Sequence, residues 1–183
     1  MRSPTSPSLP VADRPHMPGY GILPPGEGRG LLPWNWAAER LAASHNYWLA
    51  TTRPDGRAHL MAVWGVWVDG RLCFSTARNS VKAGNLRRNP RCVVSTESGA
   101  EAVIVEGTAD EVNDGPFRAQ IEKAYTAKYG EGFPSNSHLL AVRPTVAFAF
   151  IEAGEDFVGA ATRWRFPREA SSLRPPHTRR RET

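Results

Sequence analysis

Short polar turns join successive apolar segments through the middle of this chain, and they constrain its fold more than any other feature. Asn46 to Thr52 and Ala58 to Val68 read as strands separated by the turn Arg53-Pro54-Asp55-Gly56. Asp69-Gly70 is a two-residue hairpin signal, and Arg71 to Thr76 is the return strand. Strands joined by such short turns pair antiparallel with their neighbours.

The rest of the pattern adds three strands and a few helices. Further strands are expected at Arg91 to Glu97, Ala102 to Val112 and Leu139 to Glu152, with Phe157 to Phe166 as a candidate last short strand. Helices are expected at Pro33 to Ser44, Val81 to Arg88 and Gly115 to Tyr129. Helices inserted at only two or three points do not suit a βαβ fold. The pattern predicts a mainly β, α+β protein, a six-stranded antiparallel barrel decorated by helices.

Both ends of the chain lose this pattern. Residues 1–32 hold seven of the 16 prolines, and this segment is predicted to be a disordered or draped arm. Residues 167–183 carry five arginines against two glutamates and are predicted to be a basic disordered tail. The folded domain is therefore 33–166. It carries 15 basic and 14 acidic residues, so the net charge of +5 does not indicate a nucleic-acid partner.

The sequence lacks the signals that are typical of several classes of protein. The chain has no apolar run of roughly 18 to 20 residues and no apolar signal segment at its start, so a cytoplasmic protein without a membrane partner is expected. Cys73 and Cys92 have no metal-ligand spacing, are interpreted as core thiols, and no metal site is predicted. Walker A, GxSxG, HExxH and GxGxxG motifs are absent from the sequence.

The segment Phe74 to Leu86 carries the most chemistry. A strand ends in the hydroxyls of Ser75 and Thr76, and a helix begins near Ser80, with Lys82 in its first turn and Asn85 one turn later. Free backbone N–H groups, hydroxyls and an ammonium group at a helix start suit a phosphate monoester. A simple N-cap at Ser80 with a solvated Lys82 fits the same residues.

Two tryptophans lie on the long second strand. Trp64 and Trp67 are three residues apart, so they face opposite sides of the strand unless Gly65 shifts the register. One of these tryptophans can pack against a flat, conjugated ligand. A place in the barrel core is an equally good interpretation.

Five motifs in this order resemble the pyridoxamine 5'-phosphate oxidase-like proteins with an FMN-binding split barrel. They are LATTRPDGRAH, WVDGRLCFST, SVKAGNLRRNPR, VIVEGTA and ATRWRF. The closest likeness is to the flavin/deazaflavin oxidoreductases, whose members often use the coenzyme F420 in place of FMN. The resemblance covers about Trp34 to Phe166.

The resemblance implies a homodimer with a cofactor in each of two interface clefts. It places the phosphate at Ser75, Thr76, Ser80, Lys82 and Asn85, and the cofactor ring beside Met61, Ala62, Val63 and Trp64, with the Trp164 region approaching from either protomer. Ala62 replaces a frequent proline, and Gly84 replaces a common basic residue, which weakens the case for the glutamyl chain of F420. Arg78, Arg87 and Arg88 can compensate.

The function implied is hydride transfer between reduced F420, or FMN, and a small conjugated organic substrate. An FMN-dependent enzyme like pyridoxamine-phosphate oxidase is the alternative, although the extra substrate-binding arginine and histidine signals are not recognisable. A non-catalytic F420 or flavin carrier or sensor is another alternative. Haem binding is a third, and it would require His45, His59 or His138 as an axial ligand.

Overall fold

The computed structural model describes residues 9–113, 115–134 and 137–167, which form eight strands and four helices. The strands are β1 (Val11–Asp13), β2 (Asn46–Thr52), β3 (Ala58–Val68), β4 (Arg71–Ala77), β5 (Arg91–Thr96), β6 (Glu101–Glu111), β7 (Ser137–Ile151) and β8 (Thr162–Arg165). The helices are α1 (Trp34–Ala43), α2 (Val81–Arg88), α3 (Pro116–Tyr129) and α4 (Gly154–Ala160).

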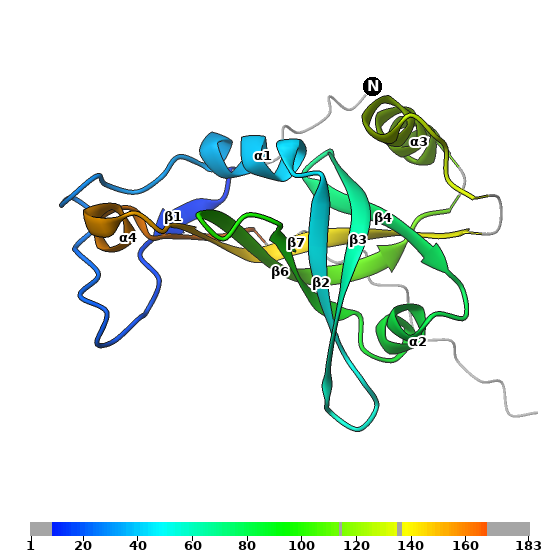
Figure 1. The fold of residues 1–183 in the computed structure, drawn as a ribbon, viewed down its shortest axis with the longest axis horizontal. Coiled ribbons are helices and arrows are strands. Elements are labelled where there is room, and N and C mark those ends of the chain that lie inside the picture. Colours follow the sequence, from blue (N-terminus) through cyan, green and yellow to red (C-terminus); the bar gives the residue numbers. More distant parts are fainter. Residues whose placement is uncertain (1–8, 114, 135–136, 168–183) are drawn as a thin grey trace, which may run out of the picture.

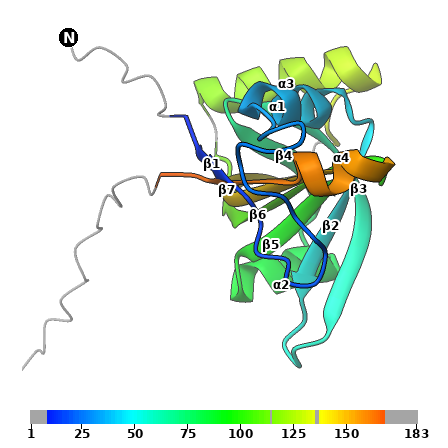
Figure 2. The same cartoon turned by 90° about the vertical axis from the view of Figure 1, so that its left-hand side faces the viewer.

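Six of the strands close into the antiparallel barrel that the sequence predicts. Their order is β7-β4-β3-β2-β5-β6, and β6 pairs with β7 to complete the ring. Strands β8 and β1 extend the sheet beyond β7. Helices α1 and α3 lie along one side of the barrel, and α2 lies at the opposite side beside the β2–β3 hairpin (Figures 1 and 2).

The two predicted turns set the register of β2, β3 and β4. Asp69 and Gly70 have φ angles of 49° and 69°, the left-handed conformation that a two-residue hairpin requires, and Val68 pairs with Arg71. The longer turn closes when the Arg53 N–H donates to the Arg57 carbonyl at 2.9 Å. Local turn chemistry therefore fixes which side chains of these strands face inward.

Three clusters of buried side chains stabilise the fold. The first fills the barrel, and Leu86 of α2 closes one end of it beside residues such as Leu49 and Phe74. The second lies between α1 and the extension formed by β6, β7 and β8. The third lies beneath α3 and includes Val66 and Tyr125.

Two segments differ from the prediction. Residues 11–13 of the expected arm form β1, because they pair with the outer edge of β8. Residues 154–160 form the helix α4, so the expected strand over 157–166 is only β8. The tail beyond Pro167 and residues 1–8 of the arm lie outside the described residues.

A buried arginine attaches the arm to the domain. The Arg14 guanidinium is 8% exposed and donates to the carbonyls of Ala161 (2.8 Å) and Gly159 (3.0 Å), and also to those of Pro24 and Glu27. The bonds to Gly159 and Ala161 join the arm to the end of α4 and to the residue before β8, and the other two are within the arm. Arg14 therefore anchors the arm to the domain.

Replacing Arg14 with methionine is expected to lower the free energy of unfolding by about 2 kcal/mol, because buried carbonyls lose their donors. Urea unfolding of wild type and Arg14→Met measures the difference. Arg29→Met is the control, since its ion pair with Asp156 is solvent-exposed and worth little. Equal losses in the two variants would contradict the role assigned to Arg14.

None of the helices in the described residues combines the length and apolar character that crossing a bilayer requires.

Candidate functional site

Strands β3 and β4 separate part-way along their length, and this separation creates the candidate site. They pair only from Gly65–Phe74 to Val68–Arg71. Beyond that point Ala58–Trp64 pairs with β2 on one side only, and Ser75–Ala77 pairs only with β7. We call the side of Ala58–Trp64 that faces away from β2 the open edge of β3. Alternate residues of such an edge present free backbone N–H and C=O groups, which can bind a flat ring edge-on.

Helix α2 begins at the end of β4, next to this separation. Ser80 is its N-cap, and its Oγ accepts from the Ala83 N–H at 3.2 Å. The Thr76 hydroxyl lies 3.0 Å from the same oxygen. The Gly84 N–H donates to the Ser80 carbonyl, so the N–H groups of Val81 and Lys82 are the ones without an acceptor inside the helix. Free N–H groups and two hydroxyls meet at one point, as an anion site requires.

Basic side chains surround the start of α2. Lys82, in the first turn, is partly exposed and makes no ion pair with the described residues. Arg87 donates to the Arg78 carbonyl at 2.8 Å, which holds the loop before the helix. The exposed Arg78 side chain lies 3.5 Å from Glu111. Lys82 is thus the cation best placed to bind an anion at the helix start.

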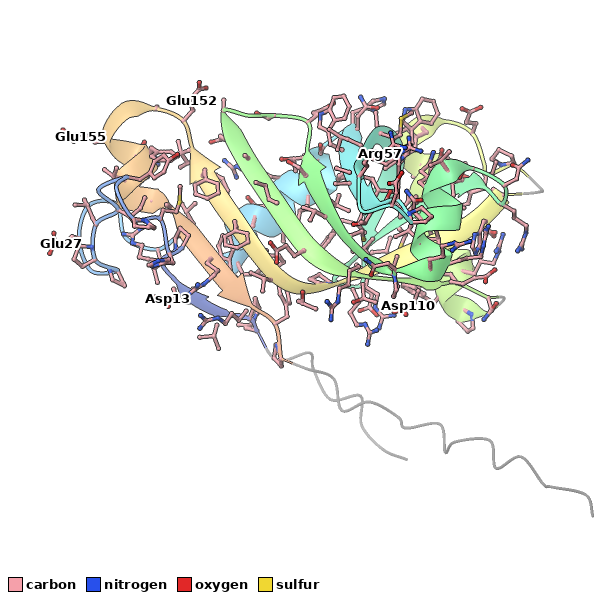
Figure 3. All side chains as sticks on the ribbon, turned by 90° about the horizontal axis from the view of Figure 1, so that it is seen from below. Asp13, Glu27, Arg57, Asp110, Glu152 and Glu155 are labelled. Carbon is pink, nitrogen blue, oxygen red and sulfur yellow. The ribbon has the colours of Figure 1, made fainter. Side chains whose placement is uncertain are left out.

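Asn85 connects α2 with the two strands of the neighbouring hairpin. Its buried amide donates to the Thr51 hydroxyl at 3.0 Å, and that hydroxyl lies 3.4 Å from Nδ1 of His59. The side chain of Asn85 therefore positions the helix rather than facing outward. Sequence analysis assigned Thr51 no role and offered His59 only as a candidate haem ligand, although the 53–56 turn already sets Thr51 opposite His59. Figure 3 shows Arg57, in the turn of this hairpin, on the same side of the molecule as α2.

The four predicted ring residues do not share one face of β3. Met61 is on the same side as His59, toward α2, and is 45% exposed. Ala62 and Trp64 are on the outer face, where Trp64 is 41% exposed. Val63 points into the barrel core, so only its backbone can contribute to the open edge. Trp67 packs against Trp34 and belongs with the core.

Two predicted site residues lie apart from the helix start. Ser75 is on the opposite side of β4 from Thr76, because neighbouring residues of a strand alternate. Trp164 is 1% exposed in the second core cluster, where its ring meets Trp34 edge-on at 5.4 Å. In the single chain Trp164 is a packing residue with almost no exposed surface, so its ring is not expected to contact a cofactor there.

The two cysteines are core thiols, as predicted. Cys73 and Cys92 are buried and unpaired. Burial raises the pKa of each thiol to about 12. Neither thiol provides a nucleophile at neutral pH.

A groove of about 900 Å³ lies elsewhere on the sheet, on the outer face from β2 to β8. Ala58, at one end of the open edge, and Thr51 are among its lining residues, whereas Met61–Trp64 and the start of α2 are not. Its rim carries Arg91, Arg143 and Arg165, and its other lining residues include Val93, Val146 and Phe166. The candidate site is therefore an open surface in one chain rather than a closed pocket.

The residues at the open edge and at α2 fit a flat heteroaromatic cofactor that carries a phosphate. Thr76, Ser80 and Lys82 with the free N–H groups would hold the phosphate, and the backbone of Met61–Trp64 would face the ring. The resemblance implies the same roles for Thr76, Ser80, Lys82 and Met61–Trp64, whereas the side chains of Ser75, Asn85 and Trp164 lie elsewhere.

The model of the family described as pyridoxamine 5'-phosphate oxidase matches residues 36–153. The chain belongs to the pyridoxamine 5'-phosphate oxidase family. The match spans the barrel strands from β2 to β7, including the open edge and all of α2. No curated protein matches the sequence.

Three solved structures illustrate what this member of the pyridoxamine 5'-phosphate oxidase family is similar to. The conserved hypothetical protein Rv2991 from Mycobacterium tuberculosis is 24% identical, with a TM-score of 0.58 over 64% of this chain and 84% of that one. An F420 reductase is 26% identical, with a TM-score of 0.49 over 60% and 93%. A heme binding protein from Mycobacterium smegmatis is 18% identical, with a TM-score of 0.54 over 70% and 62%. The first and third likenesses show a common fold.

Proposed function

We propose that the protein is a homodimeric oxidoreductase that transfers hydride between F420, or FMN, and a small conjugated organic substrate. The observation that carries the proposal is the meeting of Thr76, Ser80 and Lys82 at the start of α2, beside the open edge of β3. The KAGNL and TRWRF segments, through the family resemblance that they carry, favour F420 over FMN. Bound at this place, the cofactor would supply the hydride chemistry itself.

The chain's own residues bind and orient in this proposal. Hydroxyls, N–H groups and the Lys82 ammonium hold the phosphate, and the helix dipole adds a favourable potential. Backbone groups of Met61–Trp64 face the polar edge of the ring and stabilise negative charge that develops there. Hydride transfer needs no catalytic triad, which agrees with a site built from hydroxyls, amides and one lysine.

A second copy of the chain is proposed to cover the open site. Four large apolar side chains on β2 and β3 are exposed: Trp48 (47%), Leu60 (56%), Met61 (45%) and Trp64 (41%). They surround the proposed ring position, so covering them also excludes water from the cofactor. A symmetric dimer builds two such clefts from one pair of surfaces.

The dimer proposal predicts a molar mass twice the 20.1 kDa of one chain. Size-exclusion chromatography with light scattering measures it at micromolar concentration. A monomer that still binds cofactor tightly would contradict the proposed second wall.

Turnover tests the proposed reaction. The protein is mixed with reduced F420 or reduced FMN under anaerobic conditions, and a panel of quinones and conjugated carbonyl compounds is added. Cofactor oxidation that depends on both protein and acceptor supports an oxidoreductase. Tight cofactor binding without turnover supports the carrier or sensor alternative, and turnover of pyridoxamine 5'-phosphate with FMN supports the oxidase-like alternative.

Haem binding is retained as a second candidate because a heme binding protein shares the fold. Of the three candidate axial histidines, His138 is 5% exposed, its Nδ1 makes no hydrogen bond among the described residues, and its Nε2 lies 3.0 Å from Glu111. A Soret band after haem addition, lost in His138→Ala, would support this function.

The cytoplasmic location of the protein also stays a prediction.

A further inference from the structure

Trp64 is the centre of an ordered group of aromatic rings on the outer face of β3. Its indole lies parallel to the phenol of Tyr129, with centroids 4.7 Å apart and planes 2° from parallel. The His45 imidazole meets both rings at an angle of 65°, 6.1 Å from Trp64 and 5.2 Å from Tyr129. One indole face is covered by Tyr129, yet Trp64 is still 41% exposed. The exposed part of a backed indole is a surface on which another flat ring can stack.

Hydrogen bonds fix the position of the Tyr129 ring relative to Trp64. The Tyr129 hydroxyl accepts from the Gly65 N–H at 2.9 Å, and it lies 2.7 Å from the His45 carbonyl and 2.8 Å from the Gly65 carbonyl as possible acceptors. Gly65 directly follows Trp64 in β3. The phenol is thus tied to the backbone beside the indole that it supports.

Lys128 fastens the same end of α3 to the sheet. Its ammonium donates to the Gly65 carbonyl and the Tyr47 hydroxyl, each at 3.0 Å, and to the Ser44 carbonyl. A Cβ at Gly65 would meet the Cys73 carbonyl at 3.0 Å, so glycine lets β3 and β4 approach closely where they pair. The Lys128 bonds hold the last turn of α3 against β3, β2 and the residue after α1, and the Trp64–Tyr129 stack is preformed.

The stack lies on the other side of β3 from Met61 and α2. The proposed phosphate position and Met61 are on the α2 side, whereas Ala62 and Trp64 face outward. A cofactor bound at the open edge would lie beside Trp64. The substrate is expected on the same face of β3 as Trp64. The face of an indole ring is electron-rich, so it attracts flat rings that are poor in electrons.

We propose that Trp64 is the stacking platform for a planar, electron-poor conjugated substrate, a class that includes quinones, and that Tyr129 is its positioning residue. The inference rests on the proposed function, because it places the acceptor next to the cofactor edge. Tyr129 does not touch the substrate. It keeps the indole plane at one angle and so lowers the cost of ordering Trp64 on binding.

Titration with 2-methyl-1,4-naphthoquinone tests the proposal on the full chain. Tryptophan fluorescence and the indole–quinone charge-transfer absorbance are recorded for wild type, Trp64→Phe, Tyr129→Leu and Tyr129→Phe. Trp36→Phe is the control, because Trp36 lies on α1 beneath Arg40. We expect a saturable charge-transfer band that Trp64→Phe removes and Trp36→Phe leaves unchanged.

The two Tyr129 variants separate ring support from simple folding. Tyr129→Leu removes the stacked ring and is expected to weaken quinone binding about three- to tenfold. Tyr129→Phe keeps the ring but loses the hydroxyl contacts that fix it, and it is expected to weaken quinone binding less than Tyr129→Leu does. Equal weakening by both variants would overturn the positioning role, and a band that survives Trp64→Phe would overturn the platform whether or not the Tyr129 variants fold.

Parallel titration of F420 and FMN, followed by their own fluorescence, separates this proposal from the proposed function. Cofactor binding without quinone binding would overturn the platform alone. Saturable quinone binding at Trp64 without cofactor binding would support the platform and contradict the proposed function.

Discussion

Trp164→Ala is expected to lower the free energy of unfolding by about 3–5 kcal/mol, the usual cost of removing a buried tryptophan. The ring is 1% exposed and contacts Trp34, which also meets Phe166 edge-on at 4.9 Å and Trp67 at 6.2 Å. Trp164 pairs with Ala147 on one side and Ala12 on the other. Small neighbours cannot fill the space, so a cavity would remain between β8 and α1.

Urea unfolding with a common slope measures this loss. Trp36→Ala is the matched control, because Trp36 is only partly buried on α1, and we expect a smaller loss there. Cofactor affinity of folded Trp164→Ala should stay close to that of wild type. A stable variant with much weaker cofactor binding would instead restore Trp164 to the site.

Lys82→Ala is expected to weaken cofactor binding by about 1.5–3 kcal/mol, the scale of hydrogen bonds to charged groups, or roughly 10- to 150-fold. Lys82 lies in the first turn of α2, two residues after the Ser80 cap. Its charge adds to free N–H groups and the positive end of the helix dipole. The fold should be unaffected, because the side chain is partly exposed and supports no ion pair among the described residues.

Fluorescence titration with cofactor and with inorganic phosphate as competitor measures the effect. Lys123→Ala is the control, since Lys123 is an exposed lysine on α3, far along the chain from α2. High salt should weaken wild-type binding more than binding by Lys82→Ala, because one charge fewer is screened. Unchanged affinity in Lys82→Ala would remove this residue from the site.

Much of the barrel could be predicted because its signals are local. Asp69-Gly70 demands positive φ angles, and the 53–56 turn sets the register of β2 and β3 within one hairpin. The strand β1 could not be predicted in this way. Three residues in a proline-rich arm become a strand only because β8, about 150 residues away, offers a free edge. Arg14 then holds the arm in place by donating to distant carbonyls such as that of Ala161.

The candidate site was predictable in type but not in arrangement. The Ser80 cap and Lys82 follow from the spacing along one helix. Strand alternation already separates Ser75 from Thr76, and this signal could have excluded a shared side-chain role. The Trp64–Tyr129 stack joins β3 to the end of α3, and only the packing of α3 on the sheet reveals it. The four-residue spacing of Tyr125 and Tyr129 does indicate that both share one helix face.

The proposed site is tested by a parallel titration of cofactor-free protein with F420 and FMN, in wild type and Lys82→Ala. We expect saturable binding of one phosphate-bearing cofactor, tighter for F420, and weaker binding in Lys82→Ala. Preferential binding of FMN would move the protein to the flavin branch with the site unchanged. Binding of neither cofactor to well-folded wild-type protein would contradict the proposed site.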